Sequence, residues 1–269
     1  GTKSSGPYTE EACNRVADDI LASLGTAPPV RLTQYDDVLC LTMHHAVYDA
    51  ASFAMLCEEV TSGSPGESTS YASFARHAAA VEQQATEYWA GVLDGMVVTP
   101  CPMLQGEYSA KSARAASVSR TLATPLSQLQ AKAKETGVSL HALFLSSFCS
   151  LLSQYVGEDE VTLGLVLSGR MGDASHARVH GPCTTTVPFR WHAGHPLKKT
   201  HDALYEMLPY QFVRLASVAR ALHREGALFD ILFSFLPERG ESQLEDTMET
   251  GYPLALEVQT DAGRDAVDL

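Results

Sequence analysis

The sequence predicts an α/β fold divided into two lobes. Strand-like apolar runs alternate along the chain with longer segments whose apolar residues recur at helical spacing, and this alternation is typical of α/β proteins. Residues 61–69 contain no large apolar side chain and therefore cannot join a hydrophobic core. With 269 residues the chain is long enough for two small domains. We therefore place residues 1–68 in a first lobe and residues 69–269 in a second.

The first lobe is predicted to contain a strand pair between two helices. Pro28-Pro29 ends the first helix, since proline lacks the backbone N–H that a helix needs. A tight turn at Asp36-Asp37 joins the two strands. The second strand is apolar throughout, as is typical of a strand covered on both faces. The predicted helices cover 7–24 and 51–60, and the predicted strands cover 30–35 and 38–43.

The second lobe continues the alternation of helices and strands. We expect Gly137 to cap the end of one helix, Ser139 to cap the start of the next, and Pro209 to interrupt a later one. Loops are predicted at 100–112 and, with acidic side chains, at 240–250. The predicted helices cover 71–93, 126–136, 139–155 and 197–222, and the predicted strands cover 118–122, 161–167, 184–191, 231–236 and 252–258.

Charge and hydropathy argue against two classes of partner. Lysine and arginine number 19 against 32 acidic residues, so the formal net charge is −13 at pH 7. An acidic chain repels phosphate backbones and anionic lipids, which disfavours binding to nucleic acid and to membrane surfaces. The polar residues 1–7 lack the apolar core of a signal peptide. Residues 136–157 carry no charge, but their serines and glutamine indicate a buried helix rather than a membrane span.

The cysteines and histidines indicate neither a disulfide framework nor a metal site. The six cysteines are Cys13, Cys40, Cys57, Cys101, Cys149 and Cys183. They lie far apart with no CxxC pair, which is typical of reduced core thiols. No HExxH motif or His/Cys cluster has the spacing of metal ligands, so we predict no metal. A cytoplasmic, reducing setting is therefore expected.

The sequence around His44 and His45 is the strongest candidate for a reactive site. The pair follows an apolar strand and precedes a helix, and on an extended segment only one of two successive side chains faces a given cavity. Imidazole, with an unperturbed pKa of about 6.5, is a good general base near neutral pH. Asp49 begins the following helix, where a carboxylate can cap the helix, bind an arginine or orient a histidine ring. These residues alone leave a catalytic site and a plain helix cap as alternatives.

Ordered segments along the chain resemble a known family. His44-His45-x-x-x-Asp49-Ala50 resembles the HHxxxDG motif of condensation domains in non-ribosomal peptide synthetases, and residues 181–190 (GPCTTTVPFR) are similar to their GPxxNTxPxR segment. The particular residues in these matches, including Val-Leu-Ser-Gly-Arg at a strand end, are most similar to fungal siderophore-type synthetases. The other similar segments are 71–75, 88–93, 139–145, 161–170 and 229–233.

This resemblance implies a two-lobed chloramphenicol-acetyltransferase-like fold whose first lobe is incomplete here, residues 1–68 being its C-terminal part. It implies acyl transfer from one carrier-protein thioester to an amine or hydroxyl on another, forming an amide or ester. Phosphopantetheine arms of the upstream and downstream carrier domains would present the substrates, next to an adenylation domain, and this domain would bind no cofactor itself. A thioester is already activated, so positioning and one proton acceptor can suffice.

The resemblance also assigns roles to individual residues. It implies that His45 is the catalytic residue, either as a base toward the attacking amine or hydroxyl or by positioning that nucleophile against the thioester. It also implies that His44 and Asp49 are structural, Asp49 through an ion pair with an arginine. It implies that Arg170 and Arg190 pack the lobes together and line the tunnel between them.

Three departures from the family pattern open alternatives. Ala50 replaces the motif glycine, a change that is costly where φ is positive. Thr185 replaces an asparagine whose amide could hydrogen-bond the reacting centre. We also expect the chain to be shorter than a full condensation domain, above all upstream of Gly1. A truncated, inactive docking module is therefore an alternative function.

A stand-alone acyltransferase that uses a coenzyme A thioester is a further alternative. The acidic charge disfavours it, because the phosphates of a coenzyme prefer basic contacts. No GxSxG, GxGxxG or GxxxxGK[ST] motif occurs in the sequence. Serine hydrolase and nucleotide-binding functions therefore have no support.

Overall fold

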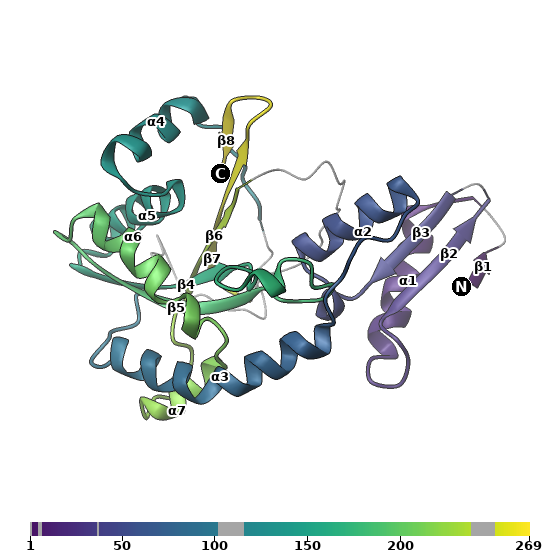
Figure 1. Cartoon of the computed structure of the whole chain (residues 1–269), viewed down its shortest axis with the longest axis horizontal. Helices are drawn as coiled ribbons and strands as arrows, with labels where there is room; N and C mark the ends of the chain where they lie inside the picture. The colour runs from purple at the N-terminus through teal and green to yellow at the C-terminus, as the bar shows by residue number, and fades with distance from the viewer. Residues whose placement is uncertain (1, 5–6, 37, 102–115, 238–250) are drawn as a thin grey trace. The chain divides into compact units, whose positions relative to one another are not determined.

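The computed structural model of the chain describes residues 2–4, 7–36, 38–101, 116–237 and 251–269 (Figure 1). The chain divides into two units, each with its own sheet. Unit 1 comprises Gly1–Phe74 together with Asp173–Cys183, and unit 2 comprises Ala75–Gly172 together with Thr184–Leu269. The assignment of two lobes that meet at residue 68 stays a prediction.

Unit 1 contains a three-stranded sheet in the order β1-β2-β3. β2 (Val30–Tyr35) and β3 (Val38–Met43) form an antiparallel hairpin over the two predicted strand ranges. Asp36, in the predicted tight turn, adopts a φ of 44°, which aspartate tolerates better than most residues. Asp37 lies outside the described residues. β1 (Thr2–Ser4) pairs with β2 in parallel and was not predicted.

One face of the hairpin packs against α1 (Glu10–Ala22), which Thr9 caps by accepting a hydrogen bond from Ala12 N. This face buries Tyr35, which is 2% exposed. On the opposite face, Leu39 is 65% exposed and Leu41 is 39% exposed. The expectation that β3 is covered on both faces is therefore wrong for the described residues, because α1 packs on one side of it.

Unit 2 contains a mixed five-stranded sheet in the order β5-β4-β6-β7-β8. β4 is parallel to β6 and β6 to β7, whereas β5 and β8 run antiparallel to their neighbours. Pro188 is tolerated in β5 because that strand lies at the sheet edge, where a missing N–H costs no ladder bond. The strands are β4 (Glu160–Leu167), β5 (Thr185–His192), β6 (Ile231–Leu236), β7 (Leu254–Asp261) and β8 (Ala266–Asp268).

Helices cover the two faces of this sheet, with α4, α5 and α6 on one side and α3 and α7 on the other (Figure 1). The main hydrophobic core of the protein lies here and includes Trp89, Leu145, Leu163 and Phe233. The helices are α3 (Tyr71–Val92), α4 (Leu126–Thr136), α5 (Leu140–Val156), α6 (Leu197–Glu206) and α7 (Leu215–Ala221), with the 3-10 helix η3 (Leu208–Tyr210) between the last two.

The predicted helix signals are confirmed in detail. Gly137 ends α4 in the left-handed conformation with a φ of 67°, and the Ser139 side chain caps α5 by accepting from Ala142 N. The predicted helix around Pro209 is broken into α6, η3 and α7. The predicted strand 118–122 is not a regular strand: it forms an isolated bridge from Thr121 to Asp268 of β8, flanked by backbone hydrogen bonds of Arg120 and Leu122. The predicted loops at 100–112 and 240–250 lie almost entirely outside the described residues.

The uncharged segment predicted as a buried helix is α5, whose buried side chains include Ala142, Leu145 and Cys149. Within the described ranges, no single helix has both the length and the apolar character needed to cross a membrane. Taken together, α4 and α5 have the length and the apolar composition of a membrane span, but the two helices are bent by 93° relative to each other. All six cysteines are free thiols.

Candidate active site

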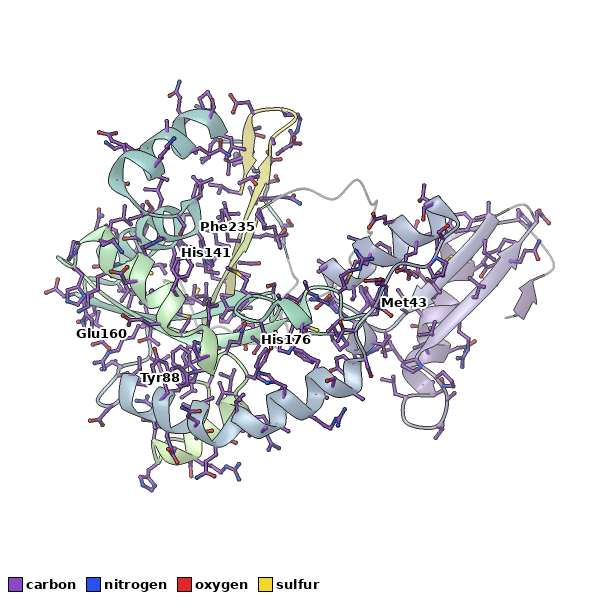
Figure 2. The ribbon with its side chains drawn as sticks, in the orientation of Figure 1. Met43, Tyr88, His141, Glu160, His176 and Phe235 are labelled. Carbon is purple, nitrogen blue, oxygen red and sulfur yellow. The ribbon has the colours of Figure 1, made fainter. Side chains whose placement is uncertain are left out.

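The two histidines lie where β3 gives way to helix in unit 1. Met43, labelled in Figure 2, ends β3, and a 3-10 helix, η1 (His45–Val47), follows it. His44 keeps an extended conformation and caps η1, its Nδ1 accepting a hydrogen bond from Ala46 N at 3.1 Å. The expectation that both histidines lie on one extended segment is therefore wrong, because His45 already belongs to the helical turn. The two rings differ in role, and the ring of His44 is a cap.

His45 is held in a defined tautomer. Its Nδ1 lies 2.8 Å from the carbonyl oxygen of Tyr48. A carbonyl oxygen can only accept, so Nδ1 must carry the proton and Nε2 presents a lone pair. The Tyr48 ring stacks on the imidazole with centroids 4.7 Å apart and planes 9° apart, and Phe53 packs in turn on Tyr48 at 5.8 Å. The half-buried ring is thereby oriented from two sides, as a general base requires.

Asp49 is buried, with 1% of its surface exposed, and begins α2 (Ala50–Ser62). Its Oδ1 accepts from Ser52 N at 2.9 Å, while the Ser52 hydroxyl accepts from Asp49 N at 2.8 Å, which completes a capping box. Its Oδ2 accepts from Cys183 N at 2.8 Å. The carboxylate therefore joins the start of α2 to a segment more than one hundred residues away. The expected ion pair with an arginine stays a prediction.

The segment bound by Asp49 is residues 173–183 of unit 1, which begins with the 3-10 helix η2 (Ala174–His176). His180 Nε2 lies 3.2 Å from Oε1 of Glu59 on α2, and Arg178 O accepts from Thr69 N at 2.9 Å. These contacts hold the segment against α2 and against the stretch that follows it. Sequence reasoning missed Cys183 as a partner of Asp49, although the residue lies in the GPxxNTxPxR-like segment already singled out.

Ala50 costs the site little. It is the first residue of α2, and the described non-glycine residues with positive φ are Asp36, His223 and Asp265. An alanine at the first position of a helix adopts ordinary helical angles, so replacing the motif glycine introduces no backbone strain.

Thr185 and Arg170 belong to unit 2, and each makes a local contact. Thr185 begins β5, and its hydroxyl donates to the carbonyl oxygen of Gln211 at 2.9 Å. Arg170 follows the end of β4, and its backbone N–H donates to the Ser168 hydroxyl at 3.3 Å. The threonine hydroxyl is therefore already engaged within its own unit.

Arg190 links β5 to the end of α3 in unit 2. Its Nη1 donates to the carbonyl oxygens of Val92 at 3.2 Å and Asp94 at 2.8 Å, and its Nη2 donates to Glu160 at 2.8 Å. Burial alone would raise the pKa of Glu160, but the hydrogen bond and charge of Arg190 hold that pKa below its usual range. These contacts describe a structural cation. Unit 1 thus contains His44, His45 and Asp49, and unit 2 contains Arg170, Thr185 and Arg190.

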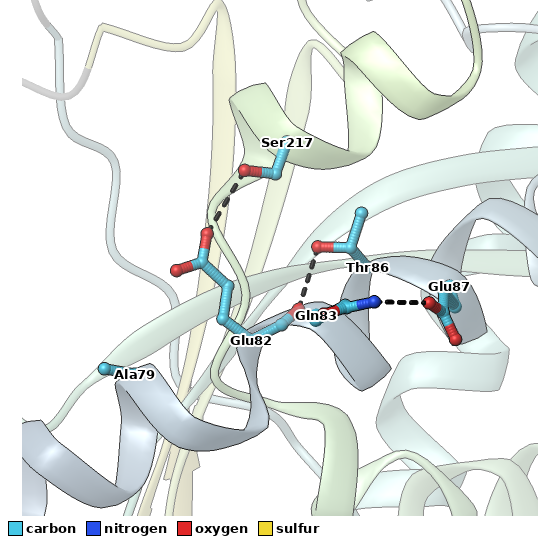
Figure 3. A pocket seen from close by; sticks show the side chains of 6 residues that line it. All are labelled: Ala79, Glu82, Gln83, Thr86, Glu87 and Ser217. Carbon is cyan, nitrogen blue, oxygen red and sulfur yellow. Dashed lines mark hydrogen bonds between the residues drawn. The ribbon is translucent and has the colours of Figure 1, made fainter.

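A hollow of about 400 Å³ lies beside α3 and α7 in unit 2 (Figure 3). Its most buried acid is Glu82, which accepts from Ser217 at 3.2 Å and from Arg214 Nη2 at 2.6 Å. The hydrogen bond from Arg214 lowers the pKa of Glu82. The carboxylate of Glu82 is thus part of an ion pair with Arg214. Among the described residues, no three or more His, Cys, Asp or Glu side chains are grouped to hold a metal ion.

Comparison with known proteins identifies the family of the chain. Residues 16–266 match the family described as Condensation domain. A ferrichrome siderophore peptide synthetase of Mycosarcoma maydis is 34% identical over an alignment of 282 positions, gaps included, that covers 94% of this chain and 7% of that protein. The nonribosomal peptide synthetase sidC of Aspergillus fumigatus is 29% identical, over 93% of this chain and 6% of its own length. The chain thus spans a small part of these curated relatives.

Solved structures give the same fold. VibH, a condensation enzyme of nonribosomal peptide synthesis, superimposes with a TM-score of 0.69 at 16% identity, covering 100% of this chain and 73% of that one. The condensation domain of the polyketide synthase MokA gives a TM-score of 0.69 at 16% identity, covering 99% of this chain and 73% of that one. These likenesses confirm the predicted chloramphenicol-acetyltransferase-like α/β fold.

Proposed function

Since the chain belongs to the condensation-domain family, we propose that it forms an amide or ester bond within a nonribosomal peptide synthetase. His45 carries this proposal. Its Nδ1 proton is held by the Tyr48 carbonyl, so its Nε2 lone pair is free to accept a proton from an attacking nucleophile. His44 and Asp49 have structural roles, since one caps η1 and the other caps α2.

The proposed reaction is one acyl transfer. The acceptor amine or hydroxyl attacks the thioester carbonyl, a C–N or C–O bond forms, and the proton of the nucleophile passes to His45 Nε2. The tetrahedral intermediate then collapses, the C–S bond breaks, and the thiolate takes the proton back from the imidazolium. The starting tautomer of His45 is restored, so one side chain suffices for the proton transfers.

We propose that both substrates are thioesters on phosphopantetheine arms of carrier domains and that the chain itself holds no cofactor. The likeness to whole synthetases supports carrier and adenylation domains as neighbours in a longer protein. The likeness to a protein named as a ferrichrome siderophore peptide synthetase supports a siderophore peptide as the product. We propose that the reaction takes place in the cytoplasm.

The test is a single-turnover reaction of the protein that contains this chain, with one carrier domain loaded with donor and the next loaded with acceptor. Mass spectrometry of the acceptor carrier measures the bond formed. His45→Gln is expected to slow it about 10²- to 10⁴-fold, the usual contribution of a general base. His195→Gln, which changes a half-buried histidine in unit 2, is the matched control and should leave the rate unchanged. Equal rates for His45→Gln and the parent would contradict the assignment.

One observation favours a second function, that of a docking module without turnover. The Thr185 hydroxyl donates to the Gln211 carbonyl, so it is a poor replacement for the amide usual at this position. A docking module would bind holo carrier domain with the same affinity in the parent and in His45→Gln, while neither forms product. A gain of turnover in Thr185→Asn would instead identify an impaired enzyme. Turnover with a free coenzyme A thioester in place of the loaded donor carrier would favour the stand-alone acyltransferase.

A further inference from the structure

Unit 2 contains a cavity of about 340 Å³ between α5, the end of β4, the α6–η3 region and the end of β6. Two of its lining residues, His141 of α5 and Phe235 of β6, lie beside each other in Figure 2. Met171 and Tyr205 also line it, and each is 51% exposed, so the cavity opens to solvent at these two side chains. Its volume lies within the range of small-molecule sites, about 300–1,000 Å³.

The walls of this cavity select an uncharged ligand. No Asp, Glu, Lys or Arg side chain is present among the described residues that line it, and most of the lining is aliphatic or aromatic. A charged group would lose its hydration there without gaining a counter-ion, which is strongly unfavourable. The hydroxyls of Ser139 and Ser168 already accept hydrogen bonds from the backbone of Ala142 and Arg170. Besides these hydroxyls and the phenol of Tyr205, the polar side chain among the described lining residues is the imidazole of His141.

The ring of His141 is fixed and neutral. It stacks on Phe235 with centroids 5.2 Å apart and on Phe233 at 5.9 Å, with planes 11° and 16° apart. Burial lowers the pKa of His141 to about 4, so the imidazole carries no charge at neutral pH. A neutral imidazole has one N–H donor and one lone pair.

The two ring nitrogens of His141 are not equivalent. Nε2 is buried and has no hydrogen-bond partner within the described part of the chain. An unpaired buried N–H is rarer in proteins than an unpaired acceptor, so the lone pair is assigned to Nε2 and the proton to Nδ1. With this assignment the ring N–H lies on Nδ1.

We propose that this cavity binds a neutral, mainly apolar molecule or group that carries one hydrogen-bond acceptor, with His141 Nδ1 as the donor. A carbonyl attached to an aromatic or aliphatic body has this chemistry. The aromatic stack holds the imidazole in place, so little side-chain entropy is lost on binding. The proposed binding can be tested independently of the proposed acyl transfer, because ligand binding is measured without turnover.

The test compares two probes of similar shape on the full chain, acetophenone, which has a carbonyl acceptor, and cumene, which has none. Ligand-detected NMR titrations give both affinities. A hydrogen bond of ordinary strength makes acetophenone bind about 2- to 10-fold tighter than cumene. In His141→Phe, which keeps an aromatic ring but removes both nitrogens, this difference should disappear while cumene binding stays. The matched control His195→Phe, outside the cavity, should bind both probes as the parent does.

A second variant tests the location without altering the imidazole. Leu208→Trp places a larger ring in the cavity wall, and both probes should lose binding at least about tenfold. This variant leaves the His141 stack in place, so it decides the question even where His141→Phe fails to fold by circular dichroism. Equal affinity of the parent for the two probes, no binding of either, or unchanged binding to Leu208→Trp would each overturn the proposal.

Discussion

Asp49 stabilises the candidate active-site region through hydrogen bonds from the backbone. Its two carboxylate oxygens accept from Ser52 N and Cys183 N, which belong to segments far apart in the sequence. A buried carboxylate is costly unless donors surround it, and backbone N–H groups at a helix start provide them together with the favourable end of the helix dipole. Asp49, which follows the loop of His44 and His45, thereby fixes where α2 begins.

We predict that Asp49→Ala lowers the free energy of unfolding by about 1–3 kcal/mol, because it removes a helix cap and leaves the Cys183 N–H unpaired in the interior. In Asp49→Asn the one remaining oxygen can accept from the Ser52 N–H. Cys183 N–H then faces the amide N–H₂ or must share that oxygen, so the loss of unfolding free energy should be intermediate. Urea unfolding followed by circular dichroism measures all three proteins. Coinciding midpoints for the parent and Asp49→Ala would show that neither contact matters.

Sequence reasoning at this scale found the local contacts and missed the distant ones. An aspartate before a helix indicates a cap, and Asp49 is one. The bond between His45 Nδ1 and the Tyr48 carbonyl depends on the 3-10 turn, which the pattern of an extended strand end did not predict. The partner Cys183 lies 134 residues away, and no local pattern connects the two positions.

At the scale of elements, predictions hold where one stretch of sequence determines the structure by itself. β2, β3, α4 and β6 match their predicted ranges, since apolar runs bounded by turn or cap residues are local signals. The stretch 118–122 has strand-like residues, yet its pairing is limited to an isolated bridge from Thr121 to Asp268 and the backbone hydrogen bonds that flank this bridge. Three-residue β8 gives too short a pattern to recognise, and it exists because β7 pairs with it.

Gly164 shows how tightly β4 is packed. A methyl group added there would lie 2.3 Å from Phe229 Cε2 and 2.6 Å from Leu232 Cδ2. We predict that Gly164→Ala destabilises unit 2 by about 1–3 kcal/mol, the usual cost of overpacking a core. Gly91→Ala is the matched control, because Gly91 lies in α3 with nothing within 4 Å of the added carbon. It should raise stability by up to about 1 kcal/mol through helix propensity. Thermal unfolding of both variants decides, and a stabilised Gly164→Ala would refute the packing argument.

At the scale of the whole molecule, the two units differ in how much apolar surface they bury. In unit 2, β4 lies between β5 and β6, and Val161, Leu163 and Leu165 are fully buried. In unit 1, β3 pairs with β2 alone, and Leu39 and Leu41 on its outer face are exposed. Burial of apolar area provides most of the stability of a fold, so the described part of unit 1 is the weaker of the two.

This difference predicts unequal protection of backbone amides in the 269-residue chain. Hydrogen-bonded amides of β4 should exchange at least about 100-fold more slowly than those of the β2–β3 hairpin, which corresponds to a difference of about 3 kcal/mol in opening free energy. The reason is that β4 opens only when the core of unit 2 unfolds, whereas the hairpin can open without exposing that core. Hydrogen–deuterium exchange with peptide mass analysis measures this, and peptides of α5, which packs on β4, provide the internal comparison because they should exchange as slowly as β4. Equal rates for hairpin and β4 peptides would mean that the two units unfold as one cooperative body.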